Sequence, residues 1–153
     1  MLLRKIRLSG LIIGGAVLAL VSLAWIYFFD VSVKTEVKWL YVGLCFGVMS
    51  GVLTIFGGYL SNDEEKINSL IVLSIALVFD ILFTVFLFVA HSDQSVISSA
   101  TQMGSKELFI VINIIAIIVS IAAIIGLCAG IALDAYAKYL SRQEDKIFQE
   151  KIK

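Results

Sequence analysis

Four long apolar stretches account for most of this chain, and short polar segments separate them. Residues 8–29, 39–62 and 108–133 contain no Asp, Glu, Lys or Arg, and residues 67–91 contain a single acid, Asp80. A helix needs about 20 predominantly apolar residues to cross the hydrocarbon core of a bilayer. The pattern therefore predicts an all-α integral membrane protein, a four-helix bundle with transmembrane spans at 8–29, 39–60, 67–91 and 108–133.

The end of the chain has a different pattern. Residues 136–153 continue the last apolar stretch without a proline or a glycine, and their charges fill much of one helical face. The apolar side chains fall near one stripe: Tyr136, Leu140, Ile147, Phe148 and Ile152. We therefore expect a transmembrane bundle over 1–135 followed by a cytoplasmic amphipathic helical tail over 136–153. Such a tail suits either the membrane surface or a partner helix, and the sequence leaves both open.

The composition agrees with a membrane bundle. Apolar residues make up 60% of the 153 residues, and the chain contains no proline. Soluble domains are nearer to about 45–50% apolar even when glycine is counted. Many transporters bind substrate at broken helices marked by glycine or proline, so the lack of proline weighs against that architecture. The loops between the spans are too short to form a soluble domain.

Basic residues gather on one side of the predicted bundle. Positive charge marks the cytoplasmic side of membrane proteins. Of the 12 Lys and Arg residues, only Lys34, Lys38 and Lys106 fall on the other side. We therefore expect both termini to be cytoplasmic, in a bacterial plasma membrane. A signal peptide cleaved after Ser22-Leu23-Ala24 is a less favoured alternative, because the apolar run continues to Phe29.

Small residues recur at four-residue spacing on three of the predicted spans, the first of which has Gly10 and Gly14. Lipid provides no hydrophobic drive between helices, so close approach of backbones at small residues matters for their association. The second span has three such glycines in series and the fourth span has two. We expect helix packing, inside the bundle or against a partner, at Gly43, Gly47, Gly51, Gly126 and Gly130.

Asp80 is the one costly residue within the apolar stretches. A central Asp costs about 2.5–3.5 kcal/mol on membrane-insertion scales, and such residues usually face the bundle interior and a partner. Counting along the spans places three hydroxyls at the same depth, those of Ser22, Ser50 and Ser120. We expect an intramembrane polar cluster in which these serines donate hydrogen bonds to Asp80. Because no basic residue lies at this depth, burial is expected to keep the acid protonated.

Two further polar features lie nearer the ends of the spans. His91 follows Asp80 by about three helical turns on nearly the same face, with Thr84 between them, which makes a sparse outward path at best. Asp134 precedes Lys138 by four residues, the favourable order for a helical ion pair. We expect this pair at the inner interface, within reach of water.

No catalytic arrangement is recognisable. The single His lies at the outer end of a span, and neither HExxH nor GxSxG occurs. We therefore expect no enzyme, no cofactor, no metal site and no nucleic-acid partner. The favoured function is a non-enzymatic accessory or assembly subunit, or an immunity- or exclusion-type protein, that contacts the lipid bilayer and another membrane protein, or itself as a homo-oligomer. The alternative is a small oligomeric proton- or cation-coupled transporter or channel that uses Asp80.

Overall fold

The computed structural model describes residues 2–32, 38–61, 68–93 and 106–152, and side chains within 8–26, 42–61, 68–93 and 107–143. The described residues form four α-helices: α1 (Leu2–Ser32), α2 (Lys38–Leu60), α3 (Asn68–Ser92) and α5 (Lys106–Ile152). Each contains a segment long and apolar enough to cross a membrane: Leu8–Ile26, Val42–Leu60, Asn68–Ser92 and Glu107–Gln143. The prediction of an all-helical chain with four such helices is confirmed, and their apolar length suggests a membrane bundle.

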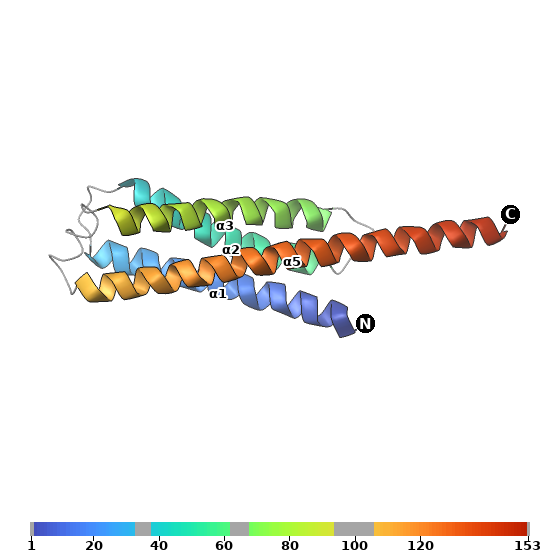
Figure 1. Ribbon diagram of the computed structural model, residues 1–153, viewed down its shortest axis with the longest axis horizontal. Helices are drawn as coiled ribbons and strands as arrows, with labels where there is room; N and C mark the ends of the chain where they lie inside the picture. The colour runs from blue at the N-terminus through green and yellow to red at the C-terminus, as the bar shows by residue number, and fades with distance from the viewer. Residues whose placement is uncertain (1, 33–37, 62–67, 94–105, 153) are drawn as a thin grey trace.

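The four helices lie side by side, and successive helices run in opposite directions (Figure 1). α2 packs against α1 and α3, while α5 packs against α3 and α1, so the helices follow one another around the bundle. Both chain termini lie at the same end (Figure 1), which we call the terminal end; the opposite end is the far end. An even number of helices in which successive helices run in opposite directions places both termini at the same end.

Buried residues on α3 and α5 repeat at alternating steps of four and three residues. On α3 they are Ser69, Leu73, Ala76, Asp80, Phe83, Leu87 and Ala90, and Thr84, next to Phe83, is buried in addition. On α5 the matching positions are Phe109, Asn113, Ala116, Ser120, Ala123, Leu127 and Asp134, of which Ala123 is half-buried, while buried Gly130 packs against Leu11 of α1. A repeat of 3.5 residues keeps one stripe of a helix facing its neighbour in left-handed coiled-coil packing. α3 and α5 therefore meet along one continuous line of contact, which we call the α3–α5 seam.

Two apolar clusters fill the core. The larger one lies toward the far end, where the rings of Trp25 and Phe109 meet edge to face with centroids 5.6 Å apart. The smaller one lies toward the terminal end and consists of Leu11, Leu73, Ala76 and Leu127. Many large apolar side chains point away from both clusters, such as Ile13, Leu20 and Ile125, each more than 60% exposed. An exterior this apolar suits contact with lipid.

The three glycines of the α2 stripe lie at close helix–helix contacts. A Cβ added to Gly51 would lie 2.6 Å from the carbonyl oxygen of Gly15 on α1. One added to Gly47 would lie 2.9 Å from the Phe83 ring on α3, and one added to Gly43 would overlap Phe86. No side chain fits at these positions without movement of a neighbour. α2 therefore approaches α1 and α3 through its glycines.

The glycines of α5 behave differently from one another. Gly130 packs against Leu11, whose Cδ2 would lie 2.9 Å from an added Cβ. Gly126 is exposed, and no atom of a neighbouring helix or side chain in the described part of the chain lies within 4 Å of its Cβ position. Of the two expected alternatives, packing inside the bundle or against a partner, the first does not apply to Gly126 within the described residues, and the second stays a prediction. Depth along a helix does not fix the direction in which a residue faces, and Gly126 faces outward.

α5 is much longer than the other helices. It spans 47 residues without interruption, through the boundary expected near residue 135. At 1.5 Å per residue this is about 70 Å of helix, against about 38 Å for α3. The additional length projects beyond the bundle at the terminal end, and no other helix accompanies its last turns (Figure 1). Tyr136 and Tyr139, where the projection starts, are exposed.

Candidate functional site

The buried polar side chains of α3 and α5 occupy three levels of the α3–α5 seam. The middle level contains Asp80, Thr84 and Ser120, and the level at the terminal end contains Ser69, Asp134 and Lys138. Toward the far end, Asn113 donates to the Leu87 carbonyl oxygen, and half-buried His91 lies one turn of helix beyond Leu87. Apolar residues separate the levels. The seam is thus both the main helix contact of α5 and the location of the costly polar groups.

Asp80 is the central residue of α3 and is fully buried. Its Oδ1 lies 2.6 Å from the Ser120 hydroxyl on α5. The Ser120 hydroxyl lies 2.6 Å from the Thr84 hydroxyl, which in turn donates to the Asp80 carbonyl oxygen at 2.8 Å. These contacts form a closed chain that begins at the carboxyl of Asp80 and returns to its backbone.

The number of hydrogen atoms available to these three contacts bears on the protonation of Asp80. Three oxygen–oxygen contacts of hydrogen-bond length need three hydrogens, and each hydroxyl carries only one. Ser120 and Thr84 together supply two of them. A protonated Asp80 supplies the third by donating from Oδ1 to Ser120, after which Ser120 donates to Thr84 and Thr84 to the carbonyl. A neutral Asp80 would therefore give each of the three contacts its own hydrogen, whereas an ionised Asp80 accepts from Ser120.

The other two serines at this depth do not contact the carboxyl. Ser22 donates to the Leu18 carbonyl oxygen of its own helix at 2.8 Å. Ser50 donates to the Ala76 carbonyl oxygen, also at 2.8 Å, one turn before Asp80 on α3. The expected cluster of Asp80 with Ser22, Ser50 and Ser120 is therefore corrected: only Ser120 is bonded to the acid, and Thr84 completes the group. Both Ser22 and Ser50 satisfy their hydroxyls on backbone carbonyls instead.

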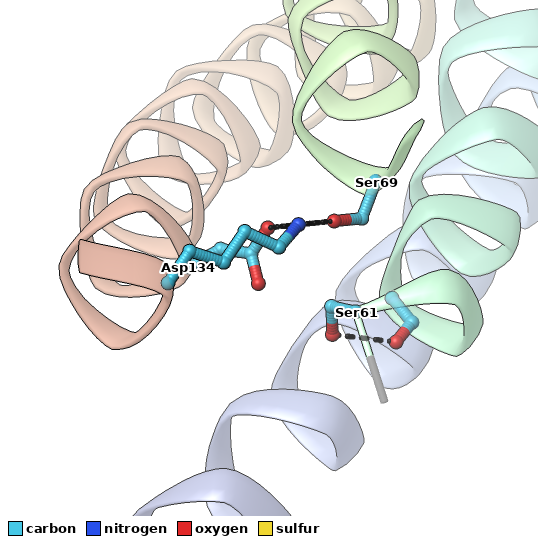
Figure 2. A network of polar contacts seen from close by, with 5 residues as sticks. Ser61, Ser69 and Asp134 are labelled. Carbon is cyan, nitrogen blue, oxygen red and sulfur yellow. Dashed lines mark hydrogen bonds and ion pairs between the residues drawn. The ribbon is translucent and has the colours of Figure 1, made fainter. Parts of the chain in front are cut away.

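At the terminal end, an ion pair within α5 is hydrogen-bonded to a serine of α3. Lys138 Nζ lies 2.9 Å from Asp134 Oδ2 and also donates to the Ser69 hydroxyl. Ser69 donates to the same Asp134 oxygen at 2.7 Å. Figure 2 shows Ser69 and Asp134 turned toward each other from their two helices, with Ser61 nearby at the end of α2. The hydroxyl of Ser69 thus lies between the two charged groups and ties them to α3.

This ion pair has the predicted partners but a different environment. Asp134 is 1% exposed and Lys138 7% exposed, so the pair is buried against α3 rather than open to water as expected. The long Lys138 side chain folds back toward the bundle to reach Asp134 and Ser69. Sequence reasoning missed Ser69 because a serine at the start of a span carries no distinctive signal of its own.

Toward the far end, the seam contains polar atoms without partners. Asn113 is fully buried and donates to the Leu87 carbonyl oxygen at 3.3 Å. Within the described part of the chain, Asn113 Oδ1 and His91 Nδ1 are buried and accept no hydrogen bond, and the same is true of Asp80 Oδ2. Buried polar atoms in native proteins are normally bonded to protein or to ordered water. These three atoms all lie in the half of the seam between Asp80 and the far end.

A groove lies between α5 and α1. Its volume is about 450 Å³, and small residues line much of it: Gly10, Gly14, Ala122, Gly126 and Ala129. Gly10, Gly14 and Gly126 have no neighbouring-helix or side-chain atom of the described residues within 4 Å of an added Cβ. The groove is therefore a surface on which backbones of two helices are open to a further occupant.

Comparison of the chain with protein families, with curated proteins and with solved structures gave no match. The described residues include no group of three or more His, Cys, Asp or Glu side chains placed to hold a metal ion. The candidate functional features of the described residues are therefore the α3–α5 seam, the groove and the projecting part of α5.

Proposed function

We propose that this chain is an integral protein of a bacterial plasma membrane, with both termini cytoplasmic, that acts without catalysis by binding another membrane protein. It would serve as an accessory or assembly subunit, or as an immunity- or exclusion-type partner. The observation that carries the proposal is the groove between α1 and α5, where Gly10, Gly14 and Gly126 are open. Small residues that allow close backbone approach are typical of contacts between membrane helices.

The contrast with α2 supports this interpretation of the groove. At Gly43, Gly47 and Gly51 the small residues are already in contact with α1 or α3. The open glycines have the same four-residue spacing on α1, and Gly126 extends the stripe that ends at Gly130 on α5. A transmembrane helix of a partner fits this pattern, because its side chains can enter the groove between the two exposed backbones.

The projecting part of α5 gives the partner a second contact. It continues along the bundle axis beyond the other helices (Figure 1), a direction that favours docking on a cytoplasmic partner over lying flat on the membrane. Exposed Tyr136, Tyr139 and Leu140 begin its apolar stripe. A helix of this kind binds through apolar anchors spaced at three and four residues.

The experiment is partner retention by a variant that fills the groove. Gly126→Leu places a side chain where nothing lies within 4 Å, so the bundle is expected to remain folded. Ile125→Leu, at the exposed neighbouring position, is the matched control. The chain is purified from native membranes in mild detergent. We expect a stoichiometric partner with the wild type and with Ile125→Leu, and a loss of at least about tenfold, or 1.4 kcal/mol, with Gly126→Leu. Equal retention by all three would contradict the proposal.

A second candidate function is a small oligomeric proton- or cation-coupled transporter or channel. It is favoured by Asp80, whose buried Oδ2 has no hydrogen-bond partner among the described residues. Four helices enclose little space, so a transport pathway would run between protomers. Asp80→Asn would then abolish transport in a chain that still assembles, whereas a partner-binding protein would keep its function.

A further inference from the structure

We propose that Asp80 is a proton-binding site that exchanges its proton with water at the far end of the bundle, along the α3–α5 seam. This inference does not depend on whether the chain binds a partner or transports an ion. It begins from the closed chain of contacts among Asp80, Ser120 and Thr84, in which two hydroxyl hydrogens serve three contacts. The missing hydrogen is the proton of the carboxylic acid.

The same side chains also accommodate the ionised acid. When the proton leaves Asp80, Ser120 can rotate its hydroxyl to donate to Oδ1 and Thr84 can rotate to donate to Ser120. The Asp80 carbonyl then loses the Thr84 hydroxyl but remains an acceptor within the helix. Binding a proton forms one O–H bond on the carboxylate and breaks no other covalent bond. Two hydroxyl rotations thus convert one hydrogen-bonded state of the site into the other.

The direction of exchange follows from where buried polar atoms lie. Asn113 Oδ1 and His91 Nδ1, both without partners in the described part of the chain, lie between Asp80 and the far end. Asp80 Oδ2 is the third such atom on the seam. Ordered water is the usual partner of buried polar groups that the protein does not satisfy. Seven residues of α3 separate Thr84 from His91, about 10 Å of helix, and Leu87 and Ala116 are buried apolar side chains of this interval.

The apolar interval of the seam is longer in the opposite direction. Between Asp80 and Ser69, α3 contributes Leu73 and Ala76 to the core, and α5 contributes Leu127. Eleven residues of α3 separate the two polar levels, which is about 16 Å of helix. The nearest hydroxyl on α2, that of Ser50, donates to the Ala76 carbonyl. Water has few polar partners on this side, so a proton reaches Asp80 more readily from the far end.

Among the described residues, no other charged side chain lies at the level of Asp80. The elements packed around the middle of α3 contribute Ser22 from α1, Ser50 from α2 and Ser120 from α5, and none of these side chains titrates in the physiological range. The described parts of these three helices contain no Asp, Glu, Lys or Arg between Leu8 and Ile26, between Val42 and Leu60, or between Leu108 and Leu133. The nearest titratable groups along the seam are His91 toward the far end and Asp134 with Lys138 at the terminal end.

Infrared spectroscopy of the full chain in lipid nanodiscs tests the proposal. The C=O band of a carboxylic acid is separate from that of a carboxylate and shifts when its proton exchanges for deuterium. We expect a carboxylic-acid band at neutral pH that is absent in Asp80→Asn and that shifts after transfer to D₂O. Asn113→Leu and His91→Leu, which remove polar atoms toward the far end, are expected to slow the shift about tenfold each, the effect of removing roughly one hydrogen bond from the path.

Ser69→Ala is the control at the terminal end, and it is expected to leave the exchange rate unchanged. Two far-end variants are used so that one that fails to fold does not remove the test. Absence of an Asp80-dependent acid band would overturn the proposal, because the site would then hold a carboxylate. A band that does not exchange within a day, or an exchange rate that responds to Ser69→Ala and to neither far-end variant, would overturn it as well.

Discussion

Ser120 on α5 and Asp80 on α3 meet at 2.6 Å near the middle of both helices, and this contact is the one interhelical hydrogen bond to an acid at the centre of the described bundle. It lies on a seam whose residues repeat every 3.5 positions, so it belongs to the regular packing of the two helices. The bond places a polar pair where apolar residues precede and follow it.

Two replacements of Asp80 are expected to distinguish the contribution of its hydrogen bond to stability from that of its ability to carry a charge. Asp80→Asn keeps a donor that can reach Ser120 and is expected to change stability by less than about 0.5 kcal/mol. Asp80→Leu removes the contact and leaves Ser120 and Thr84 bonded only to each other and to backbone, a loss of about 1–2 kcal/mol. Reversible unfolding in mixed detergent micelles measures both. Equal stability of the Asn and Leu variants would mean that the bond does not hold α3 to α5.

Gly47 and Gly51 should not tolerate a large side chain. Gly51→Leu drives a side chain into the α1 backbone at Gly15 and Ala19, and Gly47→Leu drives one into Ser22 and Phe83. Overpacking of this kind costs about 1–3 kcal/mol and more where backbone must move. We expect both variants to lower the thermal midpoint of the purified chain, while Gly126→Leu leaves it unchanged. If Gly126→Leu unfolds the bundle as readily as Gly51→Leu, the orientation of α5 described above is wrong.

The buried pair of Lys138 and Asp134 should be more sensitive to loss of one member than to loss of both charges. Lys138→Met leaves Asp134 buried with its negative charge uncompensated by Lys138, which is expected to cost about 3 kcal/mol. The double variant Asp134→Asn, Lys138→Met removes both charges and is expected to lose less than half of that. A double-mutant cycle on unfolding free energies measures the difference. Additive effects of the two substitutions would show that the pair contributes no coupling.

The expected topology is tested by labelling from one side of the membrane. Ser141→Cys lies beyond the terminal end of the bundle, whereas Ser98→Cys lies in the connection between α3 and α5. In a background with Cys45 and Cys128 replaced by serine, a membrane-impermeant thiol reagent added to intact cells is expected to label Ser98→Cys only. Labelling of Ser141→Cys from outside would reverse the orientation, and with it the cytoplasmic location of the projecting helix.

The sequence predicted the four helices well because helices long and apolar enough to cross a membrane are recognised by length and apolarity. It also predicted that Asp80 would meet Ser120, since their depths agree. It did not predict that Ser22 and Ser50 would bond backbone carbonyls, because depth along a helix leaves its rotation undetermined. The sequence pattern did not reveal the 3.5-residue repeat of buried positions, for a related physical reason. The surface that faces outward is as apolar as the core, so hydropathy does not distinguish the α3–α5 seam from the exterior.

The sequence also could not show which glycines of a stripe are covered inside the bundle and which are open. Gly126 and Gly130 have the same residue type and belong to one stripe, yet Leu11 packs against Gly130 and leaves Gly126 open. The Leu11 side chain of α1 reaches Gly130, whereas no described side chain lies within 4 Å of the Cβ position at Gly126. A stripe of glycines therefore identifies candidate contact positions, and only the assembled bundle separates occupied from open ones.

Site-specific photocrosslinking in native membranes tests the central claim, partner binding at the groove, most directly. A photoreactive residue at Ala129 lies on the groove, and one at Ile118 lies on an exposed position of the same helix outside it. We predict one crosslinked membrane protein at Ala129 that is absent at Ile118 and is lost when Gly126→Leu fills the groove. Crosslinks to lipid alone, to a second copy of this chain alone, or to the same proteins at both positions would contradict the account.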